Sequence, residues 1–269
     1  MDMNILCVGD VVGSPGRKVL AEVLPKVKAE RQIECAIVNS ENAAAGSGLT
    51  PALFDKICSA GAHLVTLGDH VYRRKEIIPV LEQSARIVRP ANLAPNAPGR
   101  QFTVWETEHG VRVGLFTLLG RMSMRMAADC PFRAADRVLS VMPNDVRVIV
   151  VEMHAEATSE KVAMGWHLDG RVSVVFGTHT HVPTADERVL PGGTAYVTDL
   201  GMTGPYDSVL GRRKDRVLSA MVSSVPVPFD VASDDVRMCG VMVRVNSETG
   251  RARSIERIRV DSTMGGEGG

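Results

Sequence analysis

Two histidines one residue apart, His179 and His181, follow a short apolar run that ends at Gly177. The run 172–176 is rich in β-branched and aromatic residues, which indicates a buried strand, and the glycine marks where the backbone leaves the sheet. In an extended segment, residues i and i+2 point the same way, so both imidazoles can converge on one point beyond the strand end. Ligands bind at such edges in open α/β folds. An isolated pair of this kind is equally consistent with two polar loop residues.

Four other apolar runs end in side chains of similar chemistry. In chain order, the polar residues at the five strand ends are Asp10, Glu41 with Asn42, Asp69 with His70, His154, and His179 with His181. The carboxyl ends of parallel strands share one edge of a sheet, so these groups should crowd together. Carboxylates and imidazoles in one crevice repel or desolvate each other unless a cation lies among them. The sequence therefore predicts a metal centre at this edge.

The composition of this group favours some metals over others. Mixed oxygen and nitrogen ligands suit Mn²⁺, Fe or Zn²⁺ rather than Ca²⁺. Seven or eight donor groups are too many for one such ion. Two ions about 3.5–4 Å apart that share a bridging carboxylate would use them all.

Alternating strands and helices are predicted for the first third of the chain. We expect strands over 4–10, 33–38 and 64–67, and helices over 17–31, 51–60 and 75–83. This alternation is typical of a parallel α/β core. Pro25 should kink or split the first helix. Thr50 and Pro51 form an N-cap followed by a first-turn proline, which fixes the start of the second.

The rest of the chain predicts a second sheet. We expect strands over 102–105, 111–118, 146–151, 172–176 and 194–198, helices over 134–142 and 156–167, and a hairpin over 236–246 and 251–260. A glycine-rich loop at 201–208 should form a wall of the pocket, because glycine lets the backbone approach a ligand closely. We expect one domain over 1–261 and a disordered tail over 262–269.

Composition excludes several classes of protein. Of the 269 residues 45% are hydrophobic, which is enough for a substantial core, and the net charge of zero argues against a broad nucleic-acid or membrane surface. The five cysteines are scattered without a Cys-x-x-Cys motif, and Cys7, Cys35 and Cys239 lie in apolar runs, so we expect buried free thiols. There is no signal-peptide pattern and no apolar run of the roughly 18–20 residues that a membrane helix needs. A reducing cytoplasm is the expected location.

Several stretches taken together resemble a known family. They are Gly9–Arg17, Asn39–Asn42, Asp129–Asp136, His154–Lys161, Gly177–His181, Leu190–Tyr196 and Gly201–Ser208. Their residues and order resemble the calcineurin-like metallophosphoesterases and, more narrowly, the bacterial YmdB family. The resemblance covers nearly the whole chain. It implies an α/β fold built as a four-layer α/β/β/α sandwich and a dinuclear centre of Fe or Mn ions, with Zn or Mg as alternatives. It also implies phosphodiesterase activity on 2′,3′-cyclic nucleotides.

The resemblance also implies a role for each residue at the strand ends. The first metal would be bound by Asp10, Asn42 and His181, the second by Asp69, His154 and His179, Glu41 would bridge the two, and His70 would be the catalytic histidine. A hydroxide shared by the two cations would attack phosphorus, and His70 would protonate the departing ribose oxygen or steady the oxyanion.

One position departs from the family pattern. The family usually has asparagine where this chain has Asp69. With two divalent ions and one hydroxide, the three carboxylates bring the centre to neutral, which attracts phosphate less. We hypothesise that the centre favours an Fe(III)/M(II) pair, which restores positive charge. The milder alternative is that Asp69 weakens the activity.

Two other classes of enzyme do not fit these residues. The turn from Gly13 to Lys18 lacks the spacing of a phosphate loop, and there is no Gly-x-Ser-x-Gly elbow of a serine hydrolase. The remaining alternative is a regulatory metal- or nucleotide-binding module with little turnover. A cyclic nucleotide, an RNA end or another small phosphodiester would each fit such a crevice, and a homo-oligomer, a dimer or a tetramer, is expected.

Some charged residues outside this group remain open. Arg121 and Arg133 lie in predicted loops that could reach the substrate, although a lone arginine is more often a surface group. Glu152 and Glu156 flank His154 and could orient it, although a surface role fits them equally well. The other three histidines, His63, His109 and His167, are interpreted as structural.

Overall fold

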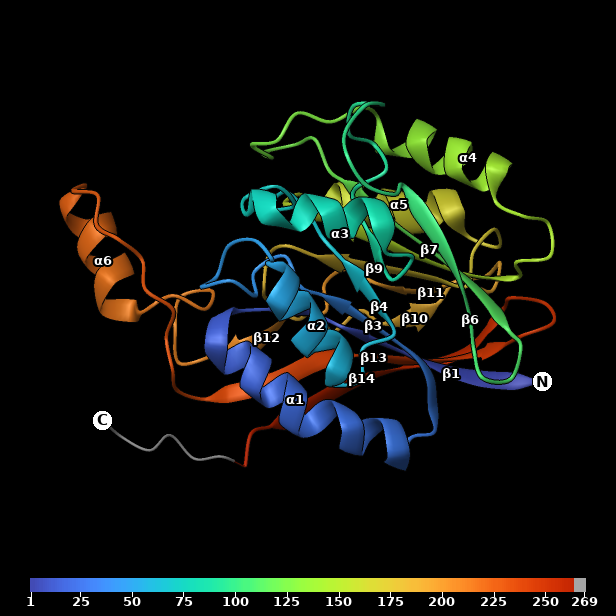
Figure 1. Cartoon of the computed structure of the whole chain (residues 1–269), viewed down its shortest axis with the longest axis horizontal. Helices are drawn as coiled ribbons and strands as arrows, with labels where there is room; N and C mark the ends of the chain where they lie inside the picture. The colour runs from blue at the N-terminus through green and yellow to red at the C-terminus, as the bar shows by residue number, and fades with distance from the viewer. Residues whose placement is uncertain (264–269) are drawn as a thin grey trace.

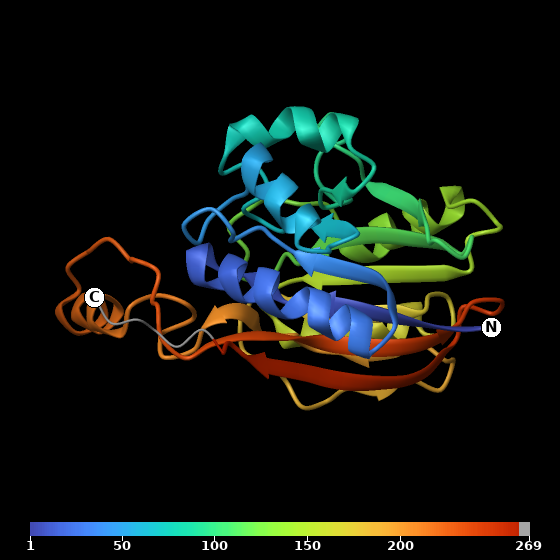
Figure 2. The ribbon, with the colours of Figure 1, turned by 60° about the horizontal axis from the view of Figure 1, so that its bottom comes forward.

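Two β-sheets lie face to face at the centre of the molecule (Figures 1 and 2), in a computed structural model that describes residues 1–263. The first sheet has, in spatial order, β2 (Asp10–Val11), β12 (Met202–Pro205), β13 (Val236–Asn246), β1 (Asp2–Val8), β3 (Ile33–Asn39), β4 (Leu64–Thr66) and β5 (Ile87–Val88), and β14 (Ala252–Asp261) pairs with β13. The second has β10 (Arg188–Val189), β11 (Ala195–Val197), β9 (Val174–Thr178), β8 (Val148–His154), β7 (Arg112–Leu119) and β6 (Phe102–Glu106).

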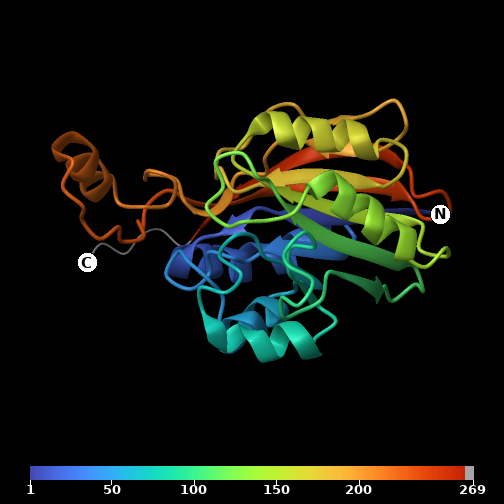
Figure 3. The ribbon, with the colours of Figure 1, turned by 90° about the horizontal axis from the view of Figure 1, so that it is seen from above.

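Helices cover both outer faces of this pair of sheets (Figure 3). The first sheet is covered by α1 (Gly13–Glu30), α2 (Pro51–Ser59), the 3₁₀ turn η1 (Lys75–Ile77) and α3 (Ile78–Gln83), and the second by α4 (Pro131–Val141) and α5 (Thr158–Leu168). The predicted four-layer α/β/β/α sandwich is confirmed.

Three apolar layers hold the sandwich together, and strand periodicity explains them. Along β1, Leu6 and Val8 pack against the helices, whereas Ile5 and Cys7 pack between the sheets. Successive side chains of a strand point to opposite faces, so a strand buried on both faces needs an unbroken apolar run. Each fully buried aliphatic side chain contributes about 1.5–3 kcal/mol. These runs are the signal that made the strands predictable.

Parallel pairing places the strand ends at one edge of each sheet. In the first sheet β1, β3, β4 and β5 run parallel to one another. In the second sheet β7, β8, β9 and β11 do the same. The carboxyl ends of β3 and β4, and those of β8 and β9, therefore lie side by side, as the strand–helix alternation predicts.

Two local predictions need correction. Pro25 does not split the helix α1, because both Pro25 and Ala21, whose carbonyl would accept the missing N–H, lie on the exposed side. A kink at Pro25 stays a prediction. The glycine-rich segment 201–208 is not a loop along the pocket. It contains the buried strand β12, which pairs with β2 and β13 and in which Gly204 lies close to Val12.

A helix that the sequence did not predict projects from the body. This helix, α6 (Lys214–Ser223), lies at one end of the molecule, away from both sheets (Figure 1). Its residues Leu218, Met221 and Val222 are exposed. We call the segment 209–232, which carries this helix, the arm.

The structure tests some of the remaining predictions, which concern the cysteines, the tail, membrane helices and the domain. The five cysteines, all within the described part of the chain, are free, and Cys7, Cys35 and Cys239 are buried as expected. Ser262 and Thr263 both donate to the Glu22 carboxylate, and the rest of the predicted tail, 264–269, lies outside the described residues. Within residues 1–263, none of the helices combines the length and apolar character that crossing a membrane requires. One domain over 1–261 stays a prediction.

Candidate metal centre

All the residues predicted for the site meet at the adjoining carboxyl edges of the two sheets. In chain order they are Asp10 at the start of β2, Glu41 and Asn42 after β3, Asp69 and His70 after β4, His154 at the end of β8, and His179 and His181 after β9. Segments up to 169 residues apart in sequence are in direct contact here, as between the His179 backbone and Asp10. These residues lie close together, as the sequence predicts. The role of each residue as a ligand stays a prediction.

Four of these side chains form a compact inner group. Ligand atoms of Glu41, Asp69, His154 and His179 all lie within 4.8 Å of one another, a spacing that fits a bound cation. His154 Nε2 is 3.2 Å from Asp69 Oδ1, 3.4 Å from Glu41 Oε1 and 3.1 Å from His179 Nδ1. Two carboxylates and two imidazoles in one small volume form a ligand set typical of a divalent first-row metal.

A second group adjoins the first through Glu41 and its neighbour Asn42. Asn42 Nδ2 lies 3.2 Å from Glu41 Oε1 and 3.1 Å from His181 Nε2. His181 Nε2 in turn lies 3.8 Å from Asp10 Oδ1. Glu41 therefore stands between the two groups, the position that a bridging carboxylate would occupy.

His70 lies at the mouth of these groups. Its side chain is 25% exposed, whereas the Glu41 side chain is 1% exposed. The His70 backbone N–H donates to Glu41 Oε2 at 3.1 Å, and Nδ1 lies 2.8 Å from Asn42 Oδ1. Because an amide oxygen only accepts, Nδ1 carries the proton. This hydrogen bond orients the ring and does not involve Nε2.

The outward nitrogens of the three other histidines fix their tautomers. Thr178 donates to Glu152, so its hydroxyl accepts from His154 Nδ1 at 2.8 Å. His181 Nδ1 donates to the Leu210 carbonyl, and His179 Nε2 lies 3.3 Å from Glu156 Oε2. Each ring is thus held by its outward nitrogen, so its inward nitrogen is the one that would face a bound metal ion. Histidines that bind metals are held in this way.

Electrostatics gives an independent test of whether a cation fits. Burial raises the pKa of Asp10 to about 8; the charge of His154 opposes the shift, and those of Glu41 and Asp199 add to it. No hydrogen-bond donor within residues 1–263 reaches Asp10 Oδ1, which is fully buried. A buried carboxylate oxygen without a partner is costly unless a cation lies beside it.

The pKa of His154 gives a second electrostatic indication. Burial alone would lower its pKa, but the charge of Glu41, the hydrogen bond to Asp69 and the nearby carboxylate of Glu152 raise it well above the usual value. The carboxylates around His154 therefore favour positive charge at its inward nitrogen, the place where a cation would balance them. The residues present fit a divalent metal ion.

Gly68 leaves the space that such an ion needs. A Cβ at this position would lie 2.2 Å from His154 Nε2 and 2.4 Å from Glu41 Oε2, in the middle of the inner group. The glycine is therefore required by the close approach of these ligand atoms, at the residue directly before Asp69.

Asp199 and Lys161 position the histidine loop, and the sequence interpretation missed them. Both are fully or nearly fully buried, and Lys161 Nζ donates to Asp199 Oδ2 at 2.7 Å. The same oxygen accepts from the hydroxyl and the backbone N–H of Thr180, between the two histidines. His179 and His181 have φ of 90° and 63°, in the left-handed region that costs about 1–3 kcal/mol per residue. The buried ion pair stabilises this strained turn.

The structure agrees with some of the interpretations of the other charged residues and histidines and differs from others. Glu152 and Glu156 both contact the histidines, as described above. Arg121 and Arg133 are exposed, and Arg133 lies in α4 rather than in a loop. His63 stacks on Trp105, which agrees with a structural interpretation of that histidine.

A double sheet covered by helices on both faces, with carboxylates and imidazoles clustered at one edge, defines a metallophosphoesterase. Comparison with known proteins narrows the class. A family model described as "YmdB-like protein" matches residues 6–258, and the chain belongs to that family.

Relatives of known sequence or structure agree with this assignment. The chain is 42% identical, over 96% of its length and 97% of the relative, to a Bacillus subtilis (strain 168) protein named 2′,3′-cyclic-nucleotide 2′-phosphodiesterase. A hypothetical protein from Thermus thermophilus has a crystal structure that superposes with a TM-score of 0.90 at 39% identity, covering 97% of this chain and 100% of that one. A novel phosphatase from Mycoplasma pneumoniae superposes with a TM-score of 0.90 at 31% identity, covering 97% and 94%.

Proposed function

We propose that this protein is a metal-dependent phosphodiesterase that hydrolyses 2′,3′-cyclic nucleotides at the bond to the 2′ oxygen. The observation that carries the proposal is the orientation of His154, His179 and His181, whose outward nitrogens are all held and whose inward nitrogens face carboxylates. The substrate class follows from the name of the Bacillus subtilis relative at 42% identity. A water molecule adds to phosphorus, the bond to the 2′ oxygen breaks, and a nucleoside 3′-monophosphate results.

The chain's own residues would hold two ions, Fe or Mn in preference to Zn or Mg. The proposed ligands are Asp10, Asn42 and His181 for one ion, Asp69, His154 and His179 for the other, and Glu41 for both. When bound, such ions lower the pKa of water and neutralise charge on phosphoryl oxygens.

His70 is the proposed catalytic residue. Its Nδ1 proton is held by Asn42, which orients Nε2 for contact with a substrate at the partly exposed mouth. A histidine there can protonate the departing 2′ oxygen or donate to a phosphoryl oxygen. Its neighbour Glu41 fixes the backbone of His70, so metal binding and positioning of the proton donor are linked.

A substrate panel tests the proposal. Protein treated with a chelator and then supplied with Mn²⁺ should hydrolyse 2′,3′-cyclic AMP to the 3′-monophosphate much faster than 3′,5′-cyclic AMP, and chelation should abolish turnover. Tight binding of the cyclic nucleotide with negligible turnover under every metal tried would instead support the alternative, a regulatory nucleotide-binding module. RNA ends belong in the same panel as a further candidate substrate.

Asp69 bears on the identity of the metals. With two divalent ions and one hydroxide, the three carboxylates would make the centre neutral, so we infer that a ferric ion occupies one position and restores positive charge. Protein loaded with Mn²⁺ alone should then bind inorganic phosphate more weakly than the Asp69→Asn variant, as measured by calorimetry. Equal affinities would remove the inference.

A homo-oligomeric state and a cytoplasmic location stay predictions.

A further inference from the structure

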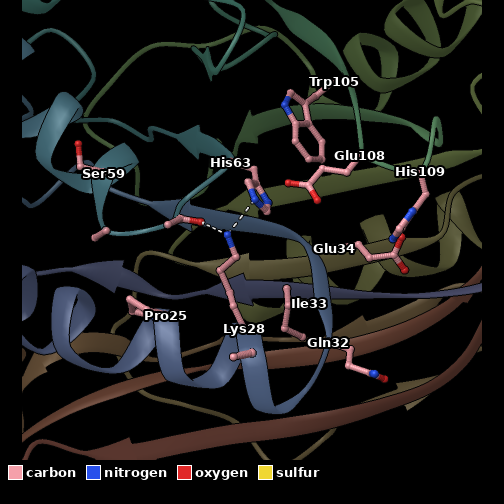
Figure 4. Close-up of a pocket in the computed structure, with 13 residues that line it drawn as sticks. Pro25, Lys28, Gln32, Ile33, Glu34, Ser59, His63, Trp105, Glu108 and His109 are labelled. Carbon is pink, nitrogen blue, oxygen red and sulfur yellow. Dashed lines mark hydrogen bonds between the residues drawn. The ribbon is translucent and has the colours of Figure 1, made fainter.

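A second cavity lies at the opposite end of α1 from the metal centre. It has a volume of about 540 Å³, within the range of small-molecule sites, and is lined by the last turns of α1, the segment 59–63 and the β6–β7 turn (Figure 4). Gly13 at the start of α1 contacts Asn42 of the metal centre, whereas Lys28 lies 15 residues further along. At 1.5 Å per residue the two sites are roughly 22 Å apart along the helix.

Lys28 and His63 form the polar centre of this cavity. Lys28 Nζ lies 2.9 Å from His63 Nε2 and donates to the Gly61 carbonyl at 2.9 Å. The Ala36 backbone N–H donates to His63 Nδ1, also at 2.9 Å. The ring is further held by stacking on Trp105, with centroids 4.7 Å apart and planes inclined by 15°. Figure 4 shows the lysine reaching from the helix toward the imidazole.

The donor and acceptor roles at these contacts bear on whether Lys28 is charged. His63 Nδ1 accepts from a backbone N–H, so it carries no proton, and the neutral ring must carry its proton on Nε2. An ammonium group has three donors and no acceptor, and two donors cannot hydrogen-bond to each other. The contact between Nε2 and Nζ is therefore a hydrogen bond only if Lys28 is a neutral amine, accepting from His63 and donating to Gly61.

The charges around the pair favour the neutral forms. Burial and the guanidinium of Arg86 lower the pKa of Lys28. Cys35 would oppose this as a thiolate, but burial raises its pKa to about 12, so it is an uncharged thiol at neutral pH. Glu108 is the remaining opposing charge. Burial, assisted by the guanidinium of Arg86, lowers the pKa of His63, so the ring is neutral as well.

We propose that Lys28 is the reactive amine of a second small-molecule site, which binds an uncharged aldehyde as an imine. The Nζ lone pair attacks the carbonyl carbon, a C=N double bond replaces the C=O double bond, and the oxygen leaves as water with the two amine protons. Glu34 and Glu108 line the cavity and disfavour an anionic ligand, whereas they stabilise the protonated, cationic imine. Trp105 and Ile33 offer apolar surface to the rest of the ligand.

Reductive trapping tests the proposal on the intact protein. Benzaldehyde and sodium cyanoborohydride at pH 7, followed by peptide mass mapping, should modify Lys28 at least about tenfold faster than Lys26, because each unit of lowered pKa gives tenfold more neutral amine. Lys26 is the matched control, since it lies on the same helix with a side chain that is 62% exposed. Modification of Lys28 at or below the rate of Lys26 would overturn the proposal.

Variants and a titration isolate the contact with His63. His63→Phe keeps a ring beside Trp105 but removes the N–H donor, so the advantage of Lys28 should vanish, whereas His109→Phe in the same cavity should keep it. Competitive acetylation of the wild type across pH needs no variant and should give Lys28 a lower apparent pKa than Lys26. Equal pKa values would overturn the proposal. Lys28→Met should leave hydrolysis at the metal centre unchanged, so this test is independent of the proposed phosphodiesterase function.

Discussion

At the scale of single residues, the candidate metal centre separates groups that would hold ions from groups that would move protons. Glu41 contacts both groups of ligands, whereas His70 lies at the mouth. We expect Glu41→Gln to lose metal and nearly all turnover, because an amide cannot bridge two cations as a carboxylate does. His70→Ala should keep its metal and lose about 10²–10³-fold in kcat, the usual effect of removing a proton donor.

Metal content and hydrolysis of bis-p-nitrophenyl phosphate, measured on both variants, decide between these roles. A Glu41→Gln protein with full metal and activity would contradict the bridging role. A His70→Ala protein without metal would make His70 a ligand rather than a proton donor.

The hydroxyl of Thr178 connects Glu152 to the ring of His154, so it should matter to metal binding without touching the ion. Thr178→Val keeps the shape of the side chain but leaves His154 Nδ1 without an acceptor. We expect metal affinity to fall about 10–100-fold, the usual effect of losing such an outer partner. Thr66→Val is the matched control, because Thr66 is a buried strand threonine whose hydroxyl has no hydrogen-bond partner among residues 1–263.

Calorimetric titration with Mn²⁺ measures both threonine variants. The Thr66→Val protein should bind metal like the wild type. Unchanged affinity in Thr178→Val would mean that the tautomer of His154 is set by other contacts.

At the scale of elements, the turn after β9 depends on one buried ion pair. Lys161→Met leaves Asp199 charged, buried and unpaired, so we expect the free energy of unfolding to fall by about 3–5 kcal/mol. The double variant Lys161→Met/Asp199→Asn removes both charges and should recover part of this loss. It should still bind metal more weakly, because Asp199 no longer holds Thr180 as a carboxylate.

Denaturant unfolding and metal titration measure these effects. Lys214→Met provides the control, since Lys214 forms an exposed ion pair with Asp207, and such pairs contribute little. A double variant no more stable than Lys161→Met would show that the loss comes from packing of the lysine stem rather than from the unpaired charge.

The elements also show what the sequence could predict. Strands buried on both faces, such as β1 and β8, appear as unbroken apolar runs, and polar residues directly after them mark the site. A role for Lys161 was not predicted, although the sequence carries a signal for its burial. Its spacing from Met164 and Leu168 places it on the buried stripe of α5, where a lysine needs a partner.

Other elements left no such signal. The strand β12 consists of a glycine-rich stretch whose close packing against Val12 depends on the tertiary fold. The helix α6, all ten of whose residues the structure describes, buries Val217 alone, so its apolar residues do not form the inward stripe that predicts a helix. Contacts between distant segments, such as the Leu210 carbonyl with His181, cannot be predicted from local pattern at all.

At the scale of the whole molecule, the body and the arm differ in how firmly they are held. Three apolar layers fix the sheets and the helices α1 to α5. The arm is attached at its base, where Arg212 donates to the carbonyls of Ala45 and Gly46, and beyond this point α6 extends away from the body (Figure 1). Regions with few buried contacts open locally at low free-energy cost.

Hydrogen exchange of the native protein should therefore separate the two parts. We expect the amides of α6 to exchange orders of magnitude faster than those of β1 or β8, and limited proteolysis to cut first within 214–229. Because Leu210 and Arg212 lie before this segment, nicked protein should keep its metal and its hydrolytic activity. Protection of α6 comparable to that of β1 would contradict an uncovered arm. It would mean that Met221 and Val222 are covered in solution, and a fall in that protection on dilution would identify the cover as a second copy of the chain.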